Sequence, residues 1–428
     1  SAFLLNRSSV LSSYLNVRAR LGMLGLAVLL GVLGAVGAAV FLTVMSWATD
    51  FVWEWLPEQV GLESVPWWYV VLGLLIGAVL IIAARGLGPG MGSPLEGFHF
   101  DIGPSRAFAA LSVALATLVF GGVLGPEAPL IVVGTVIGGL VTRNKPAQIQ
   151  QLAMALGGIA AIGTILGNPF IAAFMVLEFA ALGAMPRQAL VPMFVALGSG
   201  YLVLTGIGPF TGLGQVELAV PGLTEVDQLA FGDLLLGLVV AIIAGIAVLL
   251  SRQVGYALQR VEKVRPSIAI VVSALVIGGL ATFIMLAFDQ PYDVVPFSGE
   301  TSMDSLISET SALAVLAIVV AKALAYGVSL GGGWRGGPIF PATYIGVAAA
   351  VMVGLVITST PMSALIVAGM AAGVAAMLKL PFTAGLLAIV IGAGAGLVVT
   401  PMAIIGAIVG VTLRMAYDKA TGHTGVPM

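Results

Sequence analysis

The stretch VLGPEAPLIVVGTVIGG, residues 123–139, places one carboxylate, Glu127, between two prolines at the start of a long apolar run. An ionised side chain is costly inside a bilayer, and such residues usually serve a function. Gly125 and the prolines mark a helix start, where free backbone N–H groups and the positive end of the helix dipole favour negative charge. The stretch therefore predicts a broken transmembrane helix with a titratable group at its N-terminus.

The composition of the whole chain agrees with a membrane location. Of its 428 residues, 60% are hydrophobic and 8% are charged, whereas about a quarter of the residues in a soluble domain are charged. Uncharged runs, each close to or longer than the roughly 20 residues of a bilayer span, occur at 21–49, 64–84, 107–126, 146–177, 188–216, 234–251, 266–288, 336–378 and 380–413. Lipid offers no partner to backbone polar groups, so these runs must form helices. The predicted fold class is an all-α polytopic membrane protein.

Charged residues are divided unevenly among the loops. The charges between residues 21 and 84, between 206 and 233, and between 289 and 309 are all acidic, whereas 252–265 carries four basic side chains. By the positive-inside rule, the basic segments and both termini are expected in the cytoplasm. The expected location is the plasma membrane of a prokaryote.

The chain divides into two halves around an acidic loop. Residues 1–206 and 234–428 each open with a long helix, pass through a Gly/Pro-rich break and continue into shorter apolar segments, and 207–233 is the expected extracellular connection. Such halves suggest an inverted repeat, with a binding site where broken helices meet near the midplane. No cytoplasmic regulatory domain is expected.

Several classes of site are excluded by composition. Cysteine is absent and His99 and His423 are the only histidines, so a thiolate metal site or a histidine-based triad is hard to build. No apolar run holds the paired aspartates of an aspartyl protease. We therefore expect a protein that is not an enzyme and has no metal, cofactor or nucleic-acid partner; an intramembrane hydrolase is the alternative from another class. His99 and Asp101 are expected at a water interface rather than in a transport pathway.

Three stretches share one form: GPGMGSPLEGF at 88–98, GPEAPLIVVG at 125–134 and GGGWRGGPIFPATYIG at 331–346. We call them the first, second and third breaks. Each places Gly and then Pro before a predicted apolar helix, whose N-terminus can attract an anion without a full positive charge. Three such ends meeting inside a bilayer would hold an anion loosely enough to release it. The pattern therefore predicts transport of a small anion.

The three breaks resemble the signature motifs of the CLC family of chloride channels and proton-coupled exchangers, and GNPFIAAFMVLE at 167–178 is similar to a further family segment. The resemblance implies the CLC fold, with two inverted repeats and many broken or tilted helices, and a homodimer with one anion pathway per subunit. It also implies that Glu127 is the gate: its carboxylate can occupy an anion position, and protonation releases it. The expected function is transport of chloride or fluoride by proton-coupled antiport, with a passive anion channel as the alternative.

The resemblance also assigns residues to the anion site, namely Met91, Gly92, Ser93, Gly125, Ala128, Ile339 and Phe340. Met91 stands where the family usually has a serine hydroxyl, as in one subgroup of its fluoride-exporting branch. Pro126 and Ala128 replace the usual arginine and glycine beside the gate. Phe179 takes the position of the relay glutamate that many exchangers carry.

Four further side chains are candidates for supporting roles. Lys322 and Lys379 interrupt apolar helical stretches, so each is a candidate to attract an anion or to pair with Glu178. Glu178 itself fits a structural acid at a helix terminus better than a proton relay. Tyr417 is the candidate for the family tyrosine that closes the inner end of the pathway, although LRMAYDKA also fits an interfacial helix end.

Overall fold

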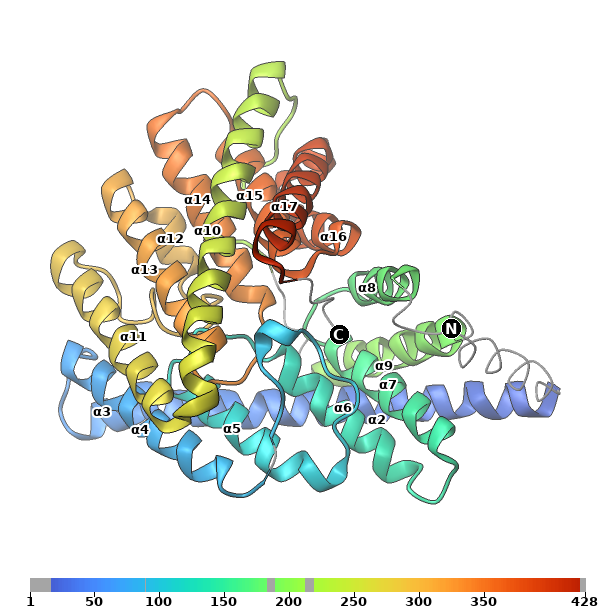
Figure 1. Ribbon diagram of the computed structural model, residues 1–428. Helices are drawn as coiled ribbons and strands as arrows, with labels where there is room; N and C mark the ends of the chain where they lie inside the picture. The colour runs from blue at the N-terminus through green and yellow to red at the C-terminus, as the bar shows by residue number, and fades with distance from the viewer. Residues whose placement is uncertain (1–16, 89, 183–188, 212–218, 424–428) are drawn as a thin grey trace.

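The computed structural model describes residues 17–88, 90–182, 189–211 and 219–423, and within these ranges the chain is helical and has no β-strand (Figure 1). The α-helices are α2 (Val17–Asp50), α3 (Leu56–Gln59), α4 (Trp67–Arg85), α5 (Ala107–Val119), α6 (Glu127–Val141), α7 (Ala147–Gly163), α8 (Pro169–Ala181), α9 (Leu190–Thr211), α10 (Phe231–Val264), α11 (Pro266–Phe288), α12 (Met303–Ser308), α13 (Ala312–Gly331), α14 (Ile339–Val356), α15 (Met362–Leu378), α16 (Pro381–Ile391) and α17 (Thr400–Thr421). Short elements are the π-helix η1 (Phe51–Trp55) and the 3₁₀ turns η2 (Pro94–Glu96), η3 (Pro104–Arg106), η5 (Ala393–Ala395) and η6 (Leu397–Val399). The all-α prediction is confirmed.

The described chain contains both long and short apolar helices. Seven stretches are long and apolar enough to cross a membrane, namely Arg20–Gln59, Trp67–Arg85, Phe231–Val264, Pro266–Phe288, Ala312–Gly331, Ile339–Val356 and Leu397–Thr421. Others are too short to span on their own, among them α6 with 15 residues and α8 with 13. Short helices of this kind leave their termini inside the protein, as the Gly/Pro breaks predict.

Helices from the two sides of the connecting loop gather in different parts of the molecule. In Figure 1, α2 to α7 lie in the lower part and α12 to α17 in the upper part, while α10 and α11 run from the upper part down to the lower helices. The two groups meet where α4 packs on α11 and where α8 packs on α16. The limits of the two halves and their inverted relation stay predictions.

Glycines allow the closest helix crossings. A Cβ atom at Gly134 of α6 would overlap the backbone of Gly157 in α7, and one at Gly346 of α14 would overlap the backbone of Gly369 in α15. Helices in a bilayer gain packing contacts when small residues let their backbones approach. The two helices that follow the second and third breaks, α6 and α14, therefore each pack closely against the next helix along the chain, α7 and α15 respectively.

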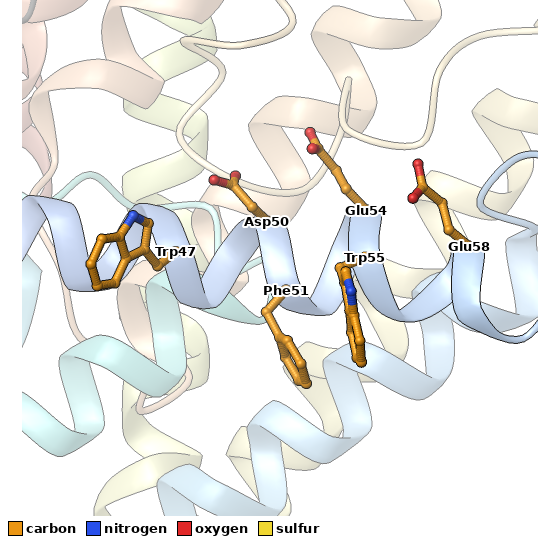
Figure 2. Close-up of a pocket in the computed structure, with 6 residues that line it drawn as sticks. All are labelled: Trp47, Asp50, Phe51, Glu54, Trp55 and Glu58. Carbon is orange, nitrogen blue, oxygen red and sulfur yellow. The ribbon is translucent and has the colours of Figure 1, made fainter. Parts of the chain in front are cut away.

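The end of the first long helix presents an acidic face and an aromatic face. Figure 2 shows the carboxylates of Asp50, Glu54 and Glu58 on one side of the helix and the rings of Phe51 and Trp55 on the other. The two rings stack with centroids 4.9 Å apart and are about half exposed. Aromatic rings beside charged groups are typical of a membrane–water interface. None of the six residues that line this shallow pocket belongs to the three breaks.

Candidate functional site

The second and third breaks are paired backbone to backbone. The N–H of Gly125 donates to the carbonyl of Gly337 at 2.8 Å, and the N–H of Gly337 donates back to the carbonyl of Gly125 at 2.5 Å. Pro126 and Pro338 are the N-cap residues of α6 and α14. The pairing fixes two helix N-termini side by side in the interior of the molecule.

Glu127, the first residue of α6, is fully buried and reaches across to α14. Its Oε1 accepts a hydrogen bond from the backbone N–H of Phe340 at 2.9 Å, and the amide of Ile339 also interacts with the carboxyl group. Its Oε2 is buried without a hydrogen-bond partner among the described residues. The carboxyl group thus lies on the free amides of another helix, where the helix dipole favours negative charge.

Glycine is required on both sides of this carboxyl group. A Cβ atom at Gly125 or at Gly337 would overlap Oε2 of Glu127. The two glycines therefore create the space into which the glutamate side chain folds.

Helix α13 holds both breaks in place. The hydroxyl of Tyr326 donates to the carbonyl of Pro338 at 2.7 Å, and the backbone N–H of Val123 donates to the hydroxyl of Ser329 at 3.1 Å. Tyr326 also interacts electrostatically with Glu127. Neither Tyr326 nor Ser329 was among the residues singled out in the sequence, because both lie inside an ordinary apolar run.

The first break differs from its prediction. It is followed by only the single 3₁₀ turn η2, so the expected apolar helix does not start there. Ser93 and Glu96 close a capping box around this turn, and Gly97 then takes a φ of +93°, which ends it. Glycine adopts this conformation without the steric cost that other residues carry. Two helix N-termini, not three, therefore belong to the site.

The three breaks nevertheless meet at one small pocket. The first break contributes Met91, Gly92, Pro94 and Gly97, the second contributes Ala128 and Val132, and the third contributes Gly336. The other lining residues are His99 and Ile102. His99 lines this pocket and its side chain is 29% exposed, and Asp101 is exposed; a water interface for these two residues stays a prediction.

The remaining predicted anion-site residues do not line this pocket. Ile339 and Phe340 instead direct their backbone amides at Glu127. The hydroxyl of Ser93 donates to the carbonyl of Leu330 at 3.3 Å and accepts from the N–H of Leu95 at 3.4 Å. Ser93 is therefore used within the fold of the first break.

Arg335 links the first and third breaks and was missed in the sequence. Its guanidinium is buried, donates through Nε to the carbonyl of Met91 at 3.1 Å and pairs through Nη2 with Glu262 at 3.2 Å. Arg85 pairs with the same carboxylate. The charge of Arg335 thus has a partner, and the signal that could have found it is a single arginine inside a glycine-rich break.

The suggested pairing of Glu178 with a lysine is wrong. Glu178 accepts hydrogen bonds from the backbone N–H of Phe382 at 2.9 Å, the N–H of Thr383 at 2.8 Å and the Thr383 hydroxyl at 2.5 Å. It therefore caps the start of α16. Lys379 pairs with Asp418 at 3.1 Å.

Lys322 organises a loop rather than pairing with an acid. It is fully buried, and its Nζ donates to the carbonyls of residues 294, 296 and 297 at 3.2, 2.9 and 3.2 Å. The same loop donates from the N–H of Phe297 to the carbonyl of Gly121 at 3.2 Å, just before the second break. The ammonium is therefore held by loop carbonyls and is not directed at the pocket.

The loop held by Lys322 brings a second acid near the gate candidate. Glu300 interacts electrostatically with Glu127, although it lies far away in sequence. Its Oε1 is buried without a described partner, while the residue as a whole is partly exposed. Burial raises the pKa of Glu300 to about 7, and a hydrogen bond from Ser298 opposes the rise.

Tyr417 lies on α17 and its described contacts are remote from the three breaks. Its hydroxyl donates to Oε1 of Gln253 at 2.7 Å, and its ring stacks on that of His423. These contacts fit an interfacial helix end.

Comparison with known proteins gives the family. The model of the voltage gated chloride channel family matches residues 92–411, which include the second and third breaks and residues 92–98 of the first. The chain belongs to the CLC family. A protein named "Putative ion-transport protein YfeO" from Escherichia coli O139:H28 (strain E24377A / ETEC) is 26% identical over 339 residues, covering 76% of this chain and 77% of its own length.

Solved CLC structures share the fold. A slow cyanobacterial Cl⁻/H⁺ antiporter superposes with a TM-score of 0.75 at 18% identity, covering 94% of this chain and 97% of the other. A CLC-type fluoride/proton antiporter gives 0.67 at 17% identity, covering 94% and 98%. A eukaryotic CLC transporter gives 0.67 at 16%, covering 94% and 73%. The predicted CLC fold is confirmed, and the chain is an integral membrane protein of an anion-transport family rather than of an enzyme family.

Proposed function

We propose that this CLC protein is a proton-coupled antiporter of a small halide, chloride or fluoride, and that Glu127 is its gate and proton carrier. The observation that carries the proposal is the seat of the Glu127 carboxylate on the amides of Ile339 and Phe340 at the start of α14. Free amides at a helix N-terminus are a binding site for any anion of suitable size. Glu127 is therefore a tethered anion in a place that a halide can also occupy.

Protonation gives this arrangement a cycle. The neutral acid no longer gains from the helix dipole, so it leaves the amides to a halide; loss of the proton restores the carboxylate as a competitor. The unpartnered Oε2 is the oxygen on which a proton can be placed without breaking the hydrogen bond from Phe340. Halide and proton then occupy the site in turn, which is the requirement for antiport.

The absence of a free fixed cation from the pocket lining suits release. The nearby guanidinium of Arg335 is paired with Glu262, and Lys322 is engaged by loop carbonyls. Partial charges stabilise an anion enough to enter and still let it leave. Met91 offers no O–H donor to the pocket. Both chloride and fluoride stay candidates, since one of the antiporters named above is a Cl⁻/H⁺ antiporter and the other a fluoride/proton antiporter.

A passive anion channel is the second candidate. Phe179, at the position of the relay glutamate, packs edge-on against Phe100 with centroids 6.3 Å apart and offers no titratable group. Halide could then pass without a coupled proton.

We also propose a homodimer with both termini in the cytoplasm. Membership of the CLC family supports the homodimer, with one anion pathway per subunit. The basic end of α10 supports the orientation. A mass measurement of the purified protein by light scattering checks the dimer.

The transport proposal is tested by flux from liposomes. Purified protein is reconstituted, efflux of chloride and of fluoride is recorded together with proton movement, and the wild type is compared with Glu127→Gln. Glu58→Gln, which changes an exposed acid away from the three breaks, is the matched control. We expect the wild type and the control to move protons against the halide, and Glu127→Gln to move halide without protons.

Three outcomes count against the proposal. Proton movement that persists unchanged in Glu127→Gln removes the gate role. Halide flux without proton movement in the wild type selects the channel. No flux of either halide overturns the assignment of the substrate class.

A further inference from the structure

His99 folds back onto the first break. A Cβ atom at Gly92 would overlap Nε2 of His99 and lie 2.8 and 3.0 Å from the neighbouring ring carbons. The Nε2 end of the imidazole therefore lies against Gly92, on the wall of the pocket shared with Met91 and Ala128. This close approach is possible because residue 92 has no side chain.

The imidazole of His99 is partly exposed to water and partly buried in the wall of the pocket. Its side chain is 29% exposed, yet Nε2 is buried and has no hydrogen-bond partner among the described residues. A buried polar group without a partner costs roughly 1–3 kcal/mol. The carboxylate of Glu96, which is 52% exposed, lies 4.0 Å from Nε2, beyond hydrogen-bond distance.

The pocket offers a ligand little else. Among the nine residues described as lining it, His99 has the only polar side chain; the others are glycine, proline, alanine, methionine, isoleucine or valine. The charged groups around this wall are engaged elsewhere: Arg106 donates to the carbonyl of Gly90 at 2.6 Å, and Arg335 binds the carbonyl of Met91 and Glu262. Glu127, at the head of α6, is seated on α14.

We propose that His99 donates its Nε2–H to the halide in this pocket and that protonation of the imidazole tightens the binding. The inference rests on the proposed transport function and adds a halide position beside the site occupied by Glu127, since neither Glu127 nor the amides of Ile339 and Phe340 line this pocket. Histidine is the side chain that ordinarily changes charge between pH 5 and 8. The His99 side chain is 29% exposed, so a proton from water can reach the ring.

Halide binding to the purified full-length protein in detergent tests the proposal. Isothermal titration with sodium chloride and with sodium fluoride is carried out at pH 5.5 and pH 7.5, the range in which a histidine ordinarily titrates. Glu127→Gln is the parent, so that the gate contributes no proton of its own. Into it are placed His99→Leu, which removes the donor, and His99→Gln, which keeps an N–H donor but does not titrate. Glu96→Gln is the matched control for the neighbouring charge.

The expected Kd values distinguish the effect of the His99 N–H donor from the effect of protonating the imidazole. His99→Leu should raise the Kd for the preferred halide by about 10-fold or more, the loss expected for a hydrogen bond to a charged group. His99→Gln should bind like the parent at pH 7.5 but lose the tightening at pH 5.5. The Glu96 variant should keep both the donor effect and the pH response.

Unchanged Kd values in His99→Leu at both pH values overturn the proposal. If that variant elutes as aggregate, the comparison of the parent with His99→Gln decides: a parent without tightening at low pH, or the same tightening in His99→Gln, overturns it equally. If coupled halide–proton flux stays intact and the His99 variants do not change the Kd, this inference alone is overturned. A wild type that moves no halide sinks the proposed function instead.

Discussion

Two buried glutamates in this molecule each lie on the N-terminus of a helix from elsewhere in the fold. Glu178 lies on α16 and accepts three hydrogen bonds, so that both of its oxygens are satisfied. Glu127 lies on α14, where the N–H of Phe340 reaches one oxygen and the other is buried without a described partner. The same local chemistry thus gives a fixed cap in one place and a releasable one in the other.

The surroundings of Glu127 also stabilise its charged form less than those of Glu178 do. Glycines 125 and 337 make the space that the Glu127 carboxyl group fills, and a second acid, Glu300, lies close enough to repel its charge. Glu178 sits between α8 and α16, which pack directly on each other. In the proposed transport cycle, the gate is therefore a helix cap whose hydrogen bonds are incomplete.

The largest expected effect is a loss of stability when the cap that Glu178 forms on α16 is broken. Glu178→Gln places an amide NH₂ against N–H donors and should lower the free energy of unfolding by roughly 3 kcal/mol, the cost of leaving buried donors unpaired. Glu127→Gln should change stability by much less, since it loses one described hydrogen bond. The measurement is thermal unfolding of the detergent-solubilised proteins by tryptophan fluorescence. Equal losses in Tm for the two variants would erase the distinction between fixed and releasable caps.

A methyl group can dislodge the incomplete cap without removing the acid. Gly337→Ala places a Cβ atom on Oε2 of Glu127, and we expect the carboxyl group to leave the amides of α14. Halide flux at neutral pH should then rise roughly 10-fold, which corresponds to about 1.4 kcal/mol of lost occupancy by the tethered anion. Liposome flux assays measure it.

The control for this substitution is the same change in the Glu127→Gln background. If Gly337→Ala acts by displacing the carboxylate, it should add nothing there, because coupled sites give non-additive effects. An equal rise in both backgrounds would assign the effect to the backbone of the third break rather than to Glu127.

The sequence predicted the parts of this site that follow local rules. Gly and Pro before apolar runs located the starts of α6 and α14, and with them Glu127. The first break has the same form, and a Ser93–Glu96 capping box starts its turn, but Gly97, with a φ of +93°, ends the turn at once. Nothing in the periodicity distinguishes a turn that propagates from one that stops.

Contacts between segments that are distant in the sequence could not be predicted from the sequence pattern. Lys322 was identified as an unusual charge in an apolar helix. Its partners could not be predicted, because they are backbone carbonyls of a loop, which every residue type possesses. His99 was expected at a water interface; its side chain is 29% exposed, but the contact of its Nε2 with Gly92 and its place in the pocket lining could not be read from the sequence pattern. Which buried group meets which ligand depends on packing between segments that the chain brings together only in three dimensions.

The smallest expected effect concerns Glu300, the acid that distinguishes the surroundings of Glu127 from those of Glu178. The folded-state pKa of Glu300 is raised from 4.5 to about 7 by burial. Below pH 4.5 the group is protonated in both the folded and the unfolded chain, so it carries no penalty. As pH rises through 7, the unfolded state ionises more easily than the folded state, and stability is lost.

Glu300→Gln should remove this loss. The variant should match the wild type in Tm at pH 4.5 and exceed it at pH 8, by about 1 kcal/mol after allowance for the part of the side chain that reaches water. Asp304→Asn, at an exposed acid four residues later, should show no such pH dependence. The gap should shrink in the Glu127→Gln background, because the repulsion between the two carboxylates is then absent. A gap of equal size in both backgrounds would mean that Glu300 titrates independently of the gate, and the contrast with Glu178 would then rest on hydrogen bonds alone.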